Sequence, residues 1–169
     1  MRRMLIFGIA ALSFAQSDRV MDEARADYRP VRTYVIRSAE KMPATDYDFR
    51  PAPDVRTFAQ QIAHIADDQY NLCAPVRGET RHARYQETEL TLRTKADLTQ
   101  ALEKAFEYCD VAYDSVTAKN AAEVVQFGNT TRTRLSMLNW NTWHTWEHYG
   151  NLVVYFRLKG IVPPSSERN

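Results

Sequence analysis

Apolar residues recur at helical spacing in four segments of the chain. The first begins at Ser17 or Asp18, which are common N-cap residues, and ends at Pro43. Pro30 lies within this segment. Because proline has no backbone N–H and its ring clashes with the preceding turn, Pro30 predicts either a kink or a later start for the first helix.

The second and third segments each carry one apolar stripe, which predicts an amphipathic helix with a single face in the core. The second follows Asp54, the expected N-cap, and ends before Pro75, whereas the third extends from about Lys95 to Val116. The predicted core positions are Val55, Phe58, Ala59, Ile62, Ala66 and Cys73 in one helix and Leu98, Leu102, Ala105, Phe106, Cys109 and Tyr113 in the other.

A fourth helix is predicted from about Arg134 to Lys159, where Gly160 provides a stop. The preceding residues, 118–133, include Gly128 and several threonines, a composition typical of a loop rather than a pair of strands. Four helices of these lengths bury their apolar faces most simply as a four-helix bundle. The predicted fold class is therefore all-α.

Residues 75–94, between the second and third helices, show no strong helical period. This connection is much longer than the ~2–8 residues usual between antiparallel neighbours in a bundle. A crossover along the bundle explains the length and makes the second and third helices parallel. A functional lid is the alternative.

The first fifteen residues follow a different pattern. Arg2 and Arg3 precede an apolar run, and Ser13 and Ala15 fit a cleavage site for a secretory signal peptide. The run is too short to span a bilayer of ~30 Å, and no cysteine follows Ala15, so no stable membrane anchor is expected. We therefore expect an exported protein, periplasmic or extracellular, with a single domain over residues 16–169. The alternative is an amphiphilic start to the first helix.

Composition narrows the class of protein further. The chain has 169 residues, of which 44% are hydrophobic, and a net charge of +1, which together indicate one globular domain. Five glycines and seven prolines leave little room for the many tight turns of an all-β fold. The 22 basic and 21 acidic residues provide no electrostatic footprint for nucleic acid, so no nucleic-acid partner is expected.

Histidines carry the candidate chemistry. His144 and His148 stand four positions apart on the fourth helix, and such neighbours lie ~5–6 Å apart at Cβ, close enough to bind one ion. His64 on the second helix is the candidate third ligand, although its polar surroundings fit a wet cleft or plain exposed surface equally well. His82 falls in the long connection, where we expect an exposed side chain that binds no metal.

Two carboxylates are candidate catalytic residues, Glu147 and Asp68. Residues 144–148 spell the inverted zinc-peptidase motif H-x-x-E-H, but only 21 residues follow His148 and Glu167 is their sole acid, so that assignment fails. Glu147 lies roughly 60° from His144 around the helix. It could orient a ligand or accept a proton from a bound water, or it could be an ordinary surface residue.

The two cysteines, Cys73 and Cys109, both lie on apolar stripes. If the second and third helices start level at Asp54 and Lys95, the cysteines are offset by about five residues, or ~7.5 Å along the axis. A disulfide needs Cα atoms within ~7 Å. The spacing therefore predicts two buried free thiols and no disulfide.

Longer stretches of the chain resemble the DinB-like family of helical bundle proteins. They are Lys41–Pro43 with Tyr47–Pro51, Phe58–Tyr70 around His64, Trp143–Asn151, and Tyr155–Pro164. The resemblance implies a bundle in up-down-down-up order and a divalent metal ion held by His64, His144 and His148.

Three imidazoles leave at least one coordination position open, as in catalytic metal sites, and nitrogen ligands suit zinc or nickel. The resulting hypothesis is a metal-dependent hydrolase acting through a bound water on an unidentified small molecule. The alternatives are a metal-binding or interaction module without catalysis and a thiol S-transferase, as in some relatives. The predicted signal peptide argues against the transferase, since low-molecular-weight thiols are kept reduced in the cytosol.

The fourth helix is apolar around most of its circumference. Leu135, Trp143, Trp146 and Val153 lie opposite the two histidines. Either the flanking helices cover both sides within the monomer, or the far face forms a two-fold homodimer interface with Trp146 as an anchor.

Overall fold

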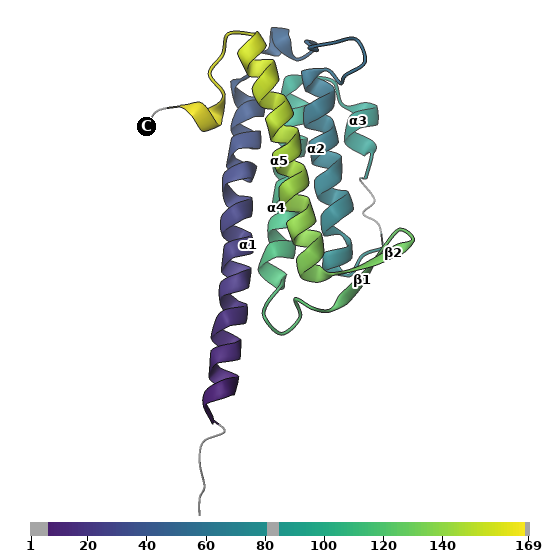
Figure 1. Ribbon diagram of the computed structural model, residues 1–169. Helices are drawn as coiled ribbons and strands as arrows, with labels where there is room; N and C mark the ends of the chain where they lie inside the picture. Colours follow the sequence, from purple (N-terminus) through teal and green to yellow (C-terminus); the bar gives the residue numbers. More distant parts are fainter. Residues whose placement is uncertain (1–6, 81–84, 168–169) are drawn as a thin grey trace, which may run out of the picture.

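The computed structural model describes residues 7–80 and 85–167. Within these residues the chain is mostly helical, with five α-helices and one small antiparallel sheet (Figure 1). None of the described helices is both long enough and apolar enough to cross a lipid bilayer. The elements, in chain order, are α1 (Phe7–Lys41), α2 (Phe58–Cys73), α3 (Glu87–Thr91), α4 (Lys95–Ser115), β1 (Val124–Phe127), β2 (Thr130–Thr133) and α5 (Arg134–Leu158), with short 3₁₀ turns η1 (Ala44–Asp46), η2 (Pro75–Arg77) and η3 (Pro164–Ser166).

The four long helices α1, α2, α4 and α5 pack side by side. Lys95, at the start of α4, donates to the carbonyls of Glu40 and Met42 at the end of α1, so these helices run in opposite directions. In Figure 1, α1 and α5 run upward while α2 and α4 run downward. Helices α2 and α4 are therefore parallel, as the long connection between them predicts.

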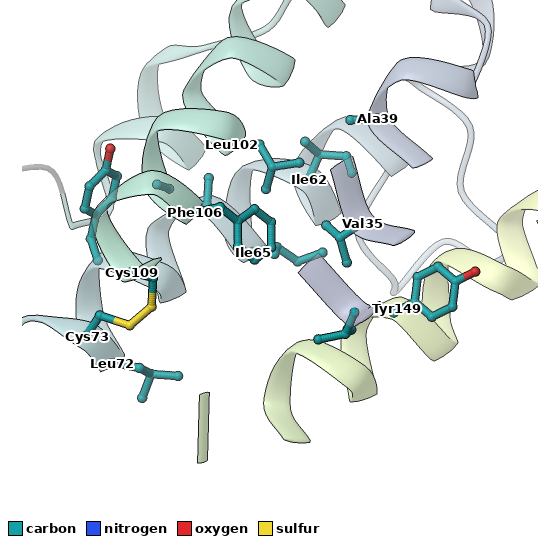
Figure 2. Close-up of a cluster of buried hydrophobic side chains, with 14 of the residues drawn as sticks. Val35, Ala39, Ile62, Ile65, Leu72, Cys73, Leu102, Phe106, Cys109 and Tyr149 are labelled. Carbon is teal, nitrogen blue, oxygen red and sulfur yellow. A yellow bond between two sulfur atoms is a disulfide. The ribbon is translucent and has the colours of Figure 1, made fainter. Parts of the chain in front are cut away.

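The core lies between these four helices. Figure 2 shows Val35 of α1, Ile62 and Ile65 of α2, and Leu102 and Phe106 of α4 within one cluster of buried side chains. Every predicted core position of α2 and α4 is buried except Val55, which is 42% exposed because it precedes the start of α2.

Helix α2 starts later than its sequence pattern predicts. Asp54 is not its N-cap. Thr57 takes that position, its side chain accepting the N–H of Gln60 while the Gln60 side chain accepts the N–H of Thr57. This reciprocal pair satisfies two N–H groups at the helix start and so outcompetes the earlier aspartate.

The prediction of free thiols is wrong. Cys73 and Cys109 form a disulfide with a Cα–Cα distance of 5.4 Å, which joins the end of α2 to α4 (Figure 2). The error follows from the misplaced helix start. Counted from the actual N-caps, Thr57 and Thr94, the two cysteines are offset by one residue, about 1.5 Å along the axis.

Two connections contain structure that the sequence pattern did not predict. Residues 118–133 include a hairpin in which Val124 pairs with Thr133 and Phe127 with Thr130. Gly128 takes the positive φ of 55° that its turn requires, and the threonines favour extended backbone. The long connection 75–94 includes α3, whose five residues are too few to show a helical period.

Helix α1 also differs from the expected bounds. It begins at Phe7 rather than at Ser17 or Asp18, and it continues through Pro30. Its first turns therefore include part of the segment expected to be a signal peptide, whose removal stays a prediction. Helix α5 ends at Leu158, and Gly160 with a φ of 70° provides the expected stop.

Trp146 of α5 is engaged within the monomer. It is 38% exposed, its indole N–H donates to the carbonyl of Asp27, and its ring packs against Tyr34 and Tyr149. These contacts agree with coverage of α5 by a flanking helix, here α1. The homodimer stays a prediction.

Candidate metal centre

Two pairs of side chains from neighbouring antiparallel helices form the candidate site. His64 and Asp68 stand four positions apart on α2, and His144 and His148 stand four positions apart on α5. One ligand atom from each of these four residues lies within 4.8 Å of the others. His82, which was expected to stay apart, lies outside the described residues.

Asp68 is at the centre of this cluster. Its Oδ2 atom lies 3.0 Å from Nε2 of His64, 3.1 Å from Nε2 of His144 and 3.7 Å from Nε2 of His148. The Nε2 atoms of His144 and His148 are 3.1 Å apart. The structure thus brings the three predicted histidine ligands together and adds Asp68, predicted as a catalytic residue, as a fourth candidate ligand.

The cluster is partly withdrawn from water. Asp68 and His148 are buried, while His64 and His144 are partly exposed. Burial raises the pKa of Asp68, but hydrogen bonds from His144, His148 and His64 together lower it more, so that its pKa lies far below its ordinary value. The same hydrogen bond to Asp68 is the main reason that the pKa of His144 is raised, against the opposing effect of burial.

The Nδ1 atom of each histidine faces a different side chain on the outside of the cluster. The Gln61 amide lies 2.6 Å from Nδ1 of His148. Glu89 of α3 lies 3.5 Å from Nδ1 of His64, and Glu147 lies 3.3 Å from Nδ1 of His144. Such outer partners fix the ring orientation and the tautomer of a metal-ligating histidine, leaving Nε2 for the metal.

Glu147 therefore lies on the far side of His144 from the cluster. This position suits a role in orienting the His144 ring better than a role in accepting a proton from a water bound at the cluster. Gln61 and Glu89 were not predicted as site residues. Gln61 belongs to the polar facet around His64 and could have been noticed there. Glu89 gave no such signal, because α3 itself was not predicted.

A pocket of about 660 Å³ adjoins the outer side of the cluster. Gln61 and Glu89 line it and also contact His148 and His64, so the pocket and the cluster share a wall. The pocket is lined by Pro51, Asp54, Val55, Arg56, Gln61, Glu89, Asn151, Val154 and Tyr155.

A buried polar layer lies beside the cluster, formed by Gln69, next to Asp68 on α2, and by Asn141 and Thr145 on α5. Gln69 donates to the Thr145 hydroxyl at 3.1 Å, and Asn141 donates to Gln69 Oε1 at 3.0 Å. If α2 slid along α5, these buried amides would lose their partners, which is costly. The hydrogen bonds therefore hold the two ligand-bearing helices in one register.

The donor set fits a divalent metal ion. Three imidazole nitrogens and a buried carboxylate oxygen converge from two rigid helices, and each imidazole has an outer partner at its other nitrogen. If His148 binds through Nε2, its Nδ1 carries the proton, and a half-turn of the Gln61 amide presents Oε1 to accept it. Nitrogen-rich sites with one carboxylate suit zinc, nickel and neighbouring transition metals.

This combination of a mostly helical fold and a three-histidine, one-aspartate cluster defines a helical protein with a candidate divalent-metal site. The chain belongs to the DinB superfamily, whose family model matches residues 9–152. The resemblance stated from the sequence is thereby confirmed.

Solved structures of low sequence identity share the fold. A DinB-like protein from Bacillus cereus has a TM-score of 0.72 at 12% identity, over 85% of this chain and 95% of that chain. A DinB-like protein from Bacillus subtilis, YjoA, has a TM-score of 0.66 at 21% identity, over 87% and 99% of the two chains. A mycothiol-dependent maleylpyruvate isomerase has a TM-score of 0.64 at 16% identity, over 80% of this chain and 65% of that chain. No curated protein matches the chain.

Proposed function

We propose that the protein is an exported, metal-dependent hydrolase whose ion, zinc or nickel, is held by His64, His144, His148 and Asp68. The observation that carries this proposal is the convergence of these four side chains beside an open pocket. A closed structural metal site would have no adjoining space for a substrate. A bound divalent ion would act as a Lewis acid and lower the pKa of a coordinated water.

The residues of the chain take separate roles in this proposal. Asp68 holds the ion together with the three histidines, since its carboxylate stays ionised and its Oδ2 lies within 3.7 Å of all three Nε2 atoms. Asn151 and Tyr155 line the pocket and orient the substrate. Glu147 orients His144 from outside.

The proposal also includes a specific fold class. Helices α1, α2, α4 and α5 form a four-helix bundle in up-down-down-up order, with residues 75–94 as the crossover. The contacts and directions of the four long helices support this description, and the hairpin β1–β2 is an addition to it.

Export is supported by the disulfide, because disulfides persist in oxidising compartments and this chain has one in its core. Amino-terminal sequencing of protein recovered from the periplasm or medium tests the cleavage site.

A thiol-dependent reaction is the second candidate, because one structural neighbour is a mycothiol-dependent isomerase. The disulfide and the predicted signal peptide argue against it, since reduced low-molecular-weight thiols are cytosolic. A metal-binding module without catalysis is the third candidate function. The pocket beside the cluster argues against it, because a site that only holds a metal needs no adjoining space for a substrate.

Metal analysis of the purified protein, followed by a panel of ester, amide and phosphoester substrates with and without chelator, tests the proposal. We expect about one zinc or nickel ion per chain and hydrolysis that chelator abolishes. His148→Ala should lose the ion, whereas His82→Ala, a matched histidine change, should retain it. A metal-loaded protein that hydrolyses nothing but acts on a substrate with added thiol would establish the second candidate.

A further inference from the structure

Helix α3 is attached to α2 directly beside the candidate ligands. Asp67, the neighbour of Asp68 in the chain, is buried, and its carboxylate accepts the backbone N–H of Thr88 at 3.1 Å and that of Glu89 at 2.9 Å. Both N–H groups belong to the first turn of α3, where no helical carbonyl is available to them. Asp67 therefore determines where α3 docks on α2, the helix that carries His64 and Asp68.

This attachment places the side chain of Glu89 between the pocket and the cluster. Its Oε1 lies 3.1 Å from Nε of Arg56, and its Oε2 lies 3.5 Å from Nδ1 of His64. The two carboxylate oxygens thus have different partners, one on the pocket side and one on the cluster side.

Glu89 is held more firmly than the other outer carboxylate, Glu147. Glu147 belongs to the same helix as His144 and its side chain is 58% exposed, so few contacts restrict it. The side chain of Glu89 is 33% exposed, with its backbone N–H bound to Asp67 and its carboxylate paired with Arg56. Two residues outside α3, Arg56 and Asp67, therefore hold Glu89 with its carboxylate at His64.

We propose that Glu89 is a positioning residue of the metal centre that accepts the Nδ1–H of His64 and so presents Nε2 to the ion. A carboxylate at Nδ1 fixes the tautomer and raises the basicity of the opposite nitrogen. Arg56 keeps the carboxylate in place from the pocket side. Helix α3, which lies within the long connection between α2 and α4, then supplies part of the metal site. This inference depends on the metal binding in the proposed function.

The test measures metal affinity rather than activity. The dissociation constants of zinc and nickel are measured by competition with a chromophoric chelator for the full chain, Glu89→Gln and Glu87→Gln. Glu87 is the matched control, since it is an exposed glutamate of the same short helix. Loss of an outer-sphere partner commonly weakens metal binding about 10–100-fold. We expect such a loss for Glu89→Gln and a change below about twofold for Glu87→Gln.

Two further measurements separate positioning from a general effect on folding. The cobalt-loaded Glu89→Gln protein should show altered d–d absorption bands, whereas its metal-free form should unfold at the same temperature as the metal-free wild type. Arg56→Gln should weaken binding less than Glu89→Gln, because it loosens the carboxylate without removing it. If the wild type binds metal and Glu89→Gln binds it equally tightly, the positioning role is wrong and the metal site stands. If the wild type binds neither ion, the proposed function is wrong and this role with it.

Discussion

Reduction of the Cys73–Cys109 disulfide should destabilise the protein strongly. The bond joins residues 36 positions apart, and it links two parallel helices across the long connection 75–94. In the loop-closure treatment, a link across 36 residues removes roughly 13 cal/mol/K of entropy from the unfolded chain, equivalent to about 3.8 kcal/mol at 25 °C. For a chain of this size that corresponds to a fall of about 10 °C in Tm.

The assay is urea unfolding of the oxidised protein and of protein reduced while unfolded and then refolded with reductant present. The variant carrying both Cys73→Ala and Cys109→Ala is the control, because reductant should not change its free energy of unfolding. A difference in free energy of unfolding of about 3–4 kcal/mol between the oxidised and reduced wild type is expected. Equal free energies in samples of verified oxidation state would refute the loop-closure reasoning. Equal gel mobility with and without reductant would refute the disulfide itself.

Three further predictions concern the metal-free protein. Its free energy of unfolding should be greatest between about pH 4 and 6.5, as urea unfolding from pH 3 to 9 would show. The lowered pKa of Asp68 gives stability that is lost as the pH falls towards the folded pKa of this carboxyl group. The raised pKa of His144 gives stability that is lost as the pH rises through the folded pKa of this imidazole. Thr57→Ala removes the N-cap of α2 and should cost about 1 kcal/mol by urea unfolding; a cost equal to that of the exposed Thr45→Ala would contradict the capping role. Phe106→Ala should cost about 3–5 kcal/mol in the core, against less than about 0.5 kcal/mol for the exposed Val111→Ala on the same helix.

Helix periodicity located the four long helices because each buries apolar residues that recur at helical spacing. Leu102 and Phe106 are in the core as expected, and α4 and α5 start at the predicted residues. The start of α2 was missed because both Asp54 and Thr57 are good caps, and only the reciprocal bond to Gln60 decides between them.

Local sequence could not show contacts between distant segments. The pair His144 and His148 was visible as a helical spacing, but the approach of His64 and Asp68 depends on how α2 faces α5. Glu89 was invisible for the same reason, since its position depends on the docking of α3 through Asp67. The disulfide was misjudged because an error of three residues in one helix start moved Cys73 by about 4.5 Å along the axis.

The disulfide and the histidine cluster both use α2, on two different sides of that helix. Cys73 ties α2 to α4, and His64 with Asp68 faces α5. A metal ion at the cluster would add a second cross-link, so that α2 would be fastened to both neighbours while α1 would be held by packing and side-chain hydrogen bonds. In hydrogen exchange, the amides of α2 should then open only with the whole protein, whereas those near the start of α1 should exchange through local fraying.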